Sequence, residues 1–136
     1  MSCRNKLQNN KAAPQLHNYT TLIIFAMRRK ITTYGGYFER FIASLSDKEI
    51  IKLNYVISLL ETEEKIPVRF IKFIRNGLYE LRMEYNSNIY RIFFIFDNDR
   101  IVVLFNGFQK KTSKTPLTEI EKALKIKEAY YADKRS

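Results

Sequence analysis

The chain has 136 residues, of which 46% are hydrophobic, and a formal net charge of +10. This length and apolar content predict one folded domain rather than a disordered chain. A single cysteine and a single histidine exclude an internal disulfide and a cysteine cluster for zinc, and they disfavour histidine-based metal or nucleophilic chemistry. The positive charge indicates an anionic partner, such as nucleic acid, an acidic protein segment or a membrane surface, but a basic surface that serves only solubility has the same composition.

Residues 1–26 are expected to lie outside the domain, which we place at 27–136. Residues 1–18 are polar and basic without periodicity, and the apolar core that follows, Leu22 to Met27, is six residues long. That core is too short to span a membrane, and basic residues stand where a signal peptide would be cleaved. Two interpretations remain, an extra edge strand or sequence upstream of a true start at Met27. We favour the second, because a compact pattern begins immediately afterwards.

Regular structure is predicted from residue 28 onward. Ser46 with Glu49 three residues later forms the capping box that starts a helix, and Pro67 blocks any continuation of that helix. The predicted elements, in chain order, are a strand at 30–34, helices at 37–44 and 47–63, strands at 78–85, 88–97 and 100–110, and a last helix from 116.

Two polar dipeptides, Asn86-Ser87 and Asn98-Asp99, separate the three later strands and suit two-residue hairpin loops. Thr115 is expected to cap the last helix and Pro116 to open it. The resulting order, β-α-α-β-β-β-α, predicts an α+β domain with an antiparallel sheet packed by helices. The apolar stripe of the last helix is predicted at Leu117, Ile120, Leu124 and Tyr131.

These loop lengths also predict which strand residues face each other. With Asn86-Ser87 as the loop, Arg82 lies directly across from Arg91, and core residues pair with core residues on the other face. With Asn98-Asp99 as the next loop, Arg91 faces Asn106. One end of one sheet face then collects Arg82, Arg91, Asn106, Phe108 and Lys110. The apolar other end of this face, expected under a helix, holds Phe93, Ile95, Val102 and Leu104.

The two facing arginines need an explanation, because like charges directly opposite in a sheet cost up to about 1 kcal/mol. Glu80 or Glu84 would neutralise Arg82, whereas Arg91 has no acid within five residues on its own strand. An anion held between the arginines would relieve the repulsion, and phosphate suits the guanidinium fork. We therefore favour an anion site here over a purely structural pair, with Phe108 as a stacking surface for a base.

Three blocks of the sequence resemble one family. They are Gly77-Leu-Tyr-Glu-Leu-Arg82, Tyr90-Arg91-Ile-Phe-Phe and Val103-Leu-Phe-Asn-Gly-Phe-Gln-Lys-Lys-Thr-Ser-Lys-Thr-Pro116. In this order and at this spacing the sequence resembles the phage-derived HigB-like toxins of the RelE/ParE superfamily, over roughly residues 28 to 132. The resemblance implies the toxin half of a type II toxin–antitoxin pair. Such a toxin is usually a ribosome-dependent mRNA endoribonuclease in the cytoplasm, and its partner is a helix-turn-helix antitoxin.

The resemblance also implies roles for individual residues. Arg82 and Arg91 match phosphate-binding arginines, and Lys110 and Lys111 match basic residues of the cleavage site. Many relatives place a Tyr or His near the end of the last strand or the start of the last helix as candidate general base. Here the nearest tyrosines lie far down that helix, so the base stays open. RNA contacts are further expected from Asn106, Phe108, Thr112 and Lys114.

The expected reaction needs neither a metal nor another cofactor, because the 2′-hydroxyl of RNA attacks the adjacent phosphate. Asp97-Asn98-Asp99 resembles a fragment of a calcium loop, but Val102 stands where that loop needs glycine. Three alternatives stay open: a non-catalytic nucleic-acid- or protein-binding module, a toxin directed at DNA gyrase, and attachment to a membrane surface through residues 19–30.

Overall fold

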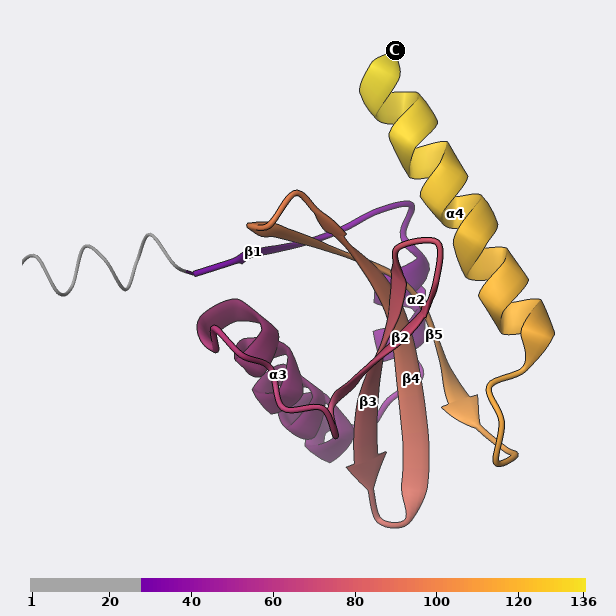
Figure 1. Ribbon diagram of the computed structural model, residues 1–136. Helices are drawn as coiled ribbons and strands as arrows, with labels where there is room; N and C mark the ends of the chain where they lie inside the picture. The colour runs from indigo at the N-terminus through magenta and orange to yellow at the C-terminus, as the bar shows by residue number, and fades with distance from the viewer. Residues whose placement is uncertain (1–27) are drawn as a thin grey trace, which may run out of the picture.

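The computed structural model describes residues 28–136 (Figure 1). Both interpretations of the segment before Met27 therefore concern residues outside the described part. The elements, in chain order, are β1 (Lys30–Thr33), α2 (Tyr37–Ile42), α3 (Asp47–Thr62), β2 (Ile71–Arg75), β3 (Leu78–Tyr85), β4 (Asn88–Asp97), β5 (Ile101–Lys110) and α4 (Leu117–Arg135).

The strands form one five-stranded sheet in the order β1-β5-β4-β3-β2. β2, β3, β4 and β5 are antiparallel to their neighbours in that run, but β1 pairs with β5 in parallel. The sheet is therefore mixed, and the prediction of a purely antiparallel sheet was wrong. No hairpin joins β1 to β5, so no short turn forces the two strands to run in opposite directions.

Helices cover both faces of the sheet, which gives three layers (Figure 1). On one face, α2 and α3 pack on the sheet through Phe41, Leu53, Val56 and Leu60. On the other face, α4 contributes the buried Ala123 and Ile126 to a second apolar cluster. The sheet is thus buried on both sides, as the long apolar runs of its central strands require.

Both ends of α3 are capped. At its start, Ser46 and Glu49 form the predicted capping box. At its end, the guanidinium of Arg29 donates hydrogen bonds of 2.7–2.9 Å to the carbonyl oxygens of Leu60, Glu63 and Glu64. Arg29 thus satisfies carbonyl groups that a helix end otherwise leaves without partners.

Strand β2 was not predicted. It forms a hairpin with β3 through Asn76 and Gly77, which both have a positive φ (52° and 77°). Asn-Gly is the favoured pair for such a tight hairpin, so this dipeptide was the signal for the missing strand. Three of the five β2 side chains are exposed, and the strand therefore lacks the apolar alternation that marks a half-buried strand.

The β3–β4 register is confirmed, but the β4–β5 register differs from the prediction. Asp97 pairs with Ile101, which makes the loop one residue longer than the predicted dipeptide, and an irregularity follows between Ile92 and Phe94. As a result Arg91 lies opposite Phe108 rather than Asn106. Val102 and Leu104 consequently pack on the α2–α3 face, and the α4 face takes Phe93, Ile95, Val103 and Phe105 instead.

The start of α4 also differs from the prediction. Pro116 is the N-cap residue, and no side chain caps the helix. The hydroxyl of Thr115, which was expected to cap, instead donates a 2.6 Å hydrogen bond to Glu80 Oε2 on β3. Leu117 is 57% exposed, so the apolar stripe begins one turn later.

The far end of α4 is fixed to the β4–β5 hairpin. Asp97 Oδ2 accepts hydrogen bonds of 2.6 Å from Tyr130 Oη and from Lys134 Nζ. Asp97 is 7% exposed, and the bonds from Lys134 and Tyr130 hold the pKa of its carboxyl below the ordinary value. Helix α4 is therefore attached to the sheet by polar contacts at both ends.

Candidate functional site

The centre of the candidate site is a buried acid between two arginines. Arg82 and Arg91 lie directly opposite each other on β3 and β4, as predicted. Glu80 Oε1 lies 3.1 Å from Arg91 Nε and 3.9 Å from Arg82 Nε. Glu80 was expected to serve Arg82 if it served either arginine, but the structure places it closer to Arg91.

Glu80 neutralises only part of this charge. Its side chain is fully buried, yet Oε1 and both arginine Nε atoms lack a hydrogen bond. The N–H of Arg91 does not point at the oxygen although the distance is short, and Arg82 Nε is too far from it. The contact is therefore an ion pair without a directed hydrogen bond, and one acid faces two guanidinium groups. The side chain of Arg82 remains 34% exposed, so the excess positive charge reaches the surface.

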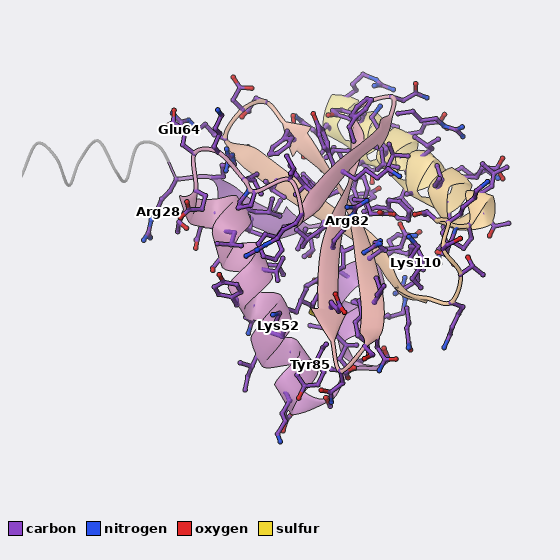
Figure 2. The ribbon with its side chains drawn as sticks, turned by 60° about the horizontal axis from the view of Figure 1, so that its bottom comes forward. Arg28, Lys52, Glu64, Arg82, Tyr85 and Lys110 are labelled. Atoms are coloured by element: carbon purple, nitrogen blue, oxygen red, sulfur yellow. The ribbon has the colours of Figure 1, made fainter. Side chains whose placement is uncertain are left out.

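Lys110, at the end of β5, belongs to the same cluster (Figure 2). Burial and the positive charge of Arg91 lower the pKa of Lys110, and the charges of Arg82 and Lys72 act in the same direction with smaller effect. Glu80 opposes this shift. Lys110 therefore loses its proton at a lower pH than an ordinary lysine does.

The basic and polar residues that follow β5 lie in an exposed loop. Lys111, Thr112 and Lys114 are exposed, and the hydroxyl of Thr112 donates a 2.8 Å hydrogen bond to the carbonyl oxygen of Lys114. This hydrogen bond lies within the loop that carries the chain from β5 to α4. Lys111 and Lys114 are therefore held near the end of β5 by a short connection.

Asn106 and Phe108 stand on the α4 side of β5, but they are not equally accessible. Asn106 is 3% exposed and donates a 3.3 Å hydrogen bond from Nδ2 to Glu119 Oε1. Phe108 is half-buried and stacks on Phe93 with the ring centroids 5.7 Å apart. Phe108 thus keeps exposed ring surface, whereas Asn106 contacts α4 from within the protein.

Neither tyrosine near the end of the last helix is brought to the arginines. Tyr130 bonds to Asp97, at the opposite end of α4 from Thr115, and burial together with this bond raises its pKa to about 12. Tyr131 packs beside Tyr130 with ring centroids 5.2 Å apart. The hydroxyl that does reach the arginine cluster is that of Thr115, through Glu80.

Basic residues on and before the unpredicted strand β2 also border the cluster. Lys72 lies opposite Glu80 in the β2–β3 strand pairing, and Arg69 lies just before β2. A groove of about 380 Å³ extends from the two arginines toward α3. Sequence analysis missed Arg69 and Lys72 because it did not predict β2. Figure 2 labels Lys52 and Arg82 among the groove residues, which are Lys52, Arg69, Phe70, Arg82, Met83, Glu84, Ile89 and Arg91.

The fold and the cluster define a class: a small α+β domain with a mixed sheet that gathers basic side chains at one end. Residues 40–128, more than half of the chain, match the family of phage-derived Gp49-like proteins. The chain therefore belongs to this family, which is a RelE/ParE-like toxin–antitoxin family and implies an antitoxin partner. A search of curated proteins found no match.

Two further features of the described residues bear on the class of site. Among residues 28–136, no three or more His, Cys, Asp or Glu side chains are grouped so that they could share a metal ion. Within the same range, no helix is long and apolar enough to cross a membrane.

Proposed function

We propose that this chain is a HigB-like toxin with a RelE-like fold that cleaves mRNA on the ribosome without a metal ion. The observation that carries the proposal is the excess of positive charge around Arg82, Arg91 and Lys110, only partly offset by Glu80. Membership of a toxin–antitoxin family supports it. The proposed catalytic residues are Arg82, Arg91, Lys110 and Lys111.

In the proposed reaction, the 2′-hydroxyl of one nucleotide attacks the adjacent phosphorus. A bond from the 2′-oxygen to phosphorus forms while the bond from phosphorus to the 5′-oxygen breaks, which leaves a 2′,3′-cyclic phosphate and a free 5′-hydroxyl. Arg82 and Arg91 stabilise the charge on the non-bridging oxygens. Lys110, with its lowered pKa, donates the proton to the departing 5′-oxygen.

The attacking 2′-hydroxyl must also lose its proton. Lys111, in its neutral form, accepts this proton, and the ribosome supplies the remaining alignment of the RNA. Thr112 and Lys114 contact the RNA backbone beside the cleaved bond. Phe108 offers a stacking surface, while the buried Asn106 acts by orienting Glu119 and the start of α4.

The test is cleavage of a defined mRNA on programmed ribosomes, with free RNA as a control. Wild type should give discrete cuts only on ribosomes, and a single 2′-deoxy substitution at the cut nucleotide should abolish that cut, because the nucleophile is gone. Arg91→Ala and the Lys110→Ala/Lys111→Ala double variant should each lose about 10²-fold or more in rate. Arg100→Ala and Lys127→Ala, which remove basic residues elsewhere, should cleave normally.

Two outcomes would contradict the proposal. Cleavage that persists at a 2′-deoxy nucleotide would exclude the 2′-hydroxyl as nucleophile. Intact mRNA from folded wild type would direct the search to a non-catalytic binding role or to a gyrase target.

The antitoxin partner that the family implies is, we propose, a protein with a helix-turn-helix DNA-binding domain. Neutralisation is most direct if an acidic segment of that partner covers the arginine cluster. Co-expression of the product of the adjacent reading frame should restore growth to cells that express wild type. A neighbouring frame that encodes no such partner, or that does not restore growth, would count against this assignment.

A further inference from the structure

A second groove lies on the β1 side of β5, next to the arginine cluster but outside it. Its volume is about 620 Å³, within the usual range for small-ligand sites. β1 pairs with β5 only along Ile101–Leu104, so the rest of β5 presents an edge that α2 and α4 flank. The groove is lined by Tyr37, Arg40, Phe41, Ser44, Leu45, Glu49, Tyr90, Gly107, Phe108, Gln109 and Lys122.

Two cations in this groove share one aromatic ring. Arg40 Cζ lies 4.9 Å from the centroid of the Tyr37 ring, and Lys122 Nζ lies 5.8 Å from the same centroid. Within residues 28–136 neither side chain forms an ion pair, and Arg40 donates only one long hydrogen bond of 3.5 Å, to the carbonyl oxygen of Gly35. Two like charges from different helices thus contact the same aromatic ring, and neither has an acidic partner among residues 28–136.

The acid in the groove is already committed to other contacts. Glu49 accepts a 2.8 Å hydrogen bond from the backbone N–H of Ser46, and it also accepts one from the hydroxyl of Tyr90. The Ser46 backbone bond, followed by the Tyr90 hydroxyl, lowers the pKa of Glu49, which therefore stays ionised. Its single charge leaves Arg40 and Lys122 in excess.

Close packing fixes the wall of the groove. Gly107 has no side chain, and a Cβ there would lie 2.7 Å from the Phe41 ring. The ring therefore packs directly on the β5 backbone and holds α2 against the strand. Because Arg40 directly precedes Phe41 on α2, this packing also fixes the position of Arg40 relative to β5.

Phe108 connects this groove to the arginine cluster. It lines the groove, and in the sheet it pairs directly with Arg91, so the two side chains start about 5 Å apart. A single strand of RNA with one phosphate at Arg91 can therefore place its next nucleotide over Phe108 and its next phosphate in the groove. Base stacking on an aromatic ring tolerates any sequence, because every base has a flat face.

We propose that the groove between α2, β5 and α4 is an RNA subsite, in which Arg40 and Lys122 bind the phosphate next to the one held by Arg82 and Arg91, and Phe108 stacks on the intervening base. The choice of RNA as ligand rests on the proposed function. The subsite extends the binding surface beyond the residues to which that function assigns chemistry.

The experiment measures binding rather than cleavage. Fluorescence anisotropy gives the affinity of each variant for a short 2′-O-methyl RNA, which has no free 2′-hydroxyl and cannot be cut, over a series of salt concentrations. Log affinity falls as log salt rises, and each lost phosphate contact makes this negative slope shallower by about 0.7 for a single strand. We expect this change for Arg40→Ala and for Lys122→Ala, and no change for Arg100→Ala and Lys127→Ala.

Phe108→Ala should weaken binding by about tenfold without a change in the salt slope, since it removes stacking and no charge. Phe108→Trp keeps a ring and should restore affinity. Because Phe108 also packs on Phe93, thermal melts of both variants verify that they are folded before binding is measured.

The outcomes separate the subsite from the nuclease. Normal salt slopes in Arg40→Ala and Lys122→Ala, or no binding by wild type at low salt, would overturn the subsite whatever the ribosome assay shows. Reduced slopes in both variants would support it even if wild type leaves ribosome-bound mRNA intact. In that case the nuclease proposal alone would fail.

Discussion

Glu80 is the residue on which the basic cluster depends most directly. It is fully buried, lies between two arginines and accepts a hydrogen bond from Thr115. Without its charge the cations of Arg82 and Arg91 would face each other in a site that water screens only in part, since Arg91 is buried. Glu80 therefore positions Arg91 and at the same time attaches the start of α4 to β3.

The change Glu80→Gln tests this role, because glutamine keeps the size and the acceptor for Thr115 but removes the charge. We expect the free energy of unfolding to fall by about 3 kcal/mol, the usual cost of breaking a buried ion pair. Sulfate should restore more stability to this variant than to wild type, since an anion can replace the lost carboxylate. Urea denaturation with and without sulfate measures both effects. Glu84→Gln, at an exposed position of the same strand, should show neither.

Lys110 gives a second prediction at this scale. Burial and then Arg91 lower its pKa, so Arg91→Ala should raise the pKa of Lys110 toward the ordinary lysine value, because one of its two main causes is removed. NMR titration of the Lys110 ammonium group measures the shift, and Arg100→Ala should leave the titration unchanged. An unaltered pKa in Arg91→Ala would mean that the two side chains do not interact.

The same lowered pKa sets the sign of the pH dependence. In the proposed reaction Lys110 donates a proton and acts only while it is protonated, so cleavage should decline as pH rises through the pKa of Lys110. That decline should begin below the range of an ordinary lysine, about 10.4.

At the scale of elements, helix α4 matters because it carries Lys122 and follows directly from the loop of Lys111 and Lys114. Thr115 attaches its start to β3, and Asp97 attaches its end to the β4–β5 hairpin. The position of the cationic loop therefore depends on contacts at both ends of the helix.

The far contact should make stability depend on pH. The pKa of Asp97 is lower in the folded state than in the unfolded chain, so its stabilisation is present above about pH 4 and is lost as pH falls through the folded pKa. Asp97→Asn should cost about 1–2 kcal/mol at neutral pH and should reduce the loss of stability in acid. Thermal melts at intervals of about one pH unit, from about pH 2 to about pH 7, measure how stability depends on pH. Asp99→Asn, in the exposed loop, should behave as wild type does.

At the scale of the whole molecule, local signals predicted most elements, and long-range pairing limited the prediction. Ser46 and Glu49 marked the start of α3, and Asn86-Ser87 marked the β3–β4 hairpin that places Arg82 opposite Arg91. By contrast, the parallel β1–β5 pair joins segments about seventy residues apart in the sequence, and no local pattern specifies it.

The site could be predicted in part for the same reason. Arg82 and Arg91 follow from the β3–β4 register, and Lys110 follows from alternation along β5, although the predicted β4–β5 register was wrong. The hydroxyl of Thr115 could bond to the adjacent helix end or to a buried acid 35 residues away, and only the packed structure decides between them. Arg40 and Lys122 belong to different helices, so their meeting over Tyr37 was not visible before the helices were placed.

The parallel pairing of β1 with β5 has a consequence for synthesis. β1 is made among the first described residues, but its partner is among the last strands to leave the ribosome, and Lys122 follows later still. A nascent chain that ends before β5 can form the β3–β4 hairpin but not the groove beside it. Protease resistance of stalled nascent chains should therefore rise abruptly only once β5 and α4 have emerged. The groove that we propose as an RNA subsite is therefore completed only after β5 and α4 have left the ribosome.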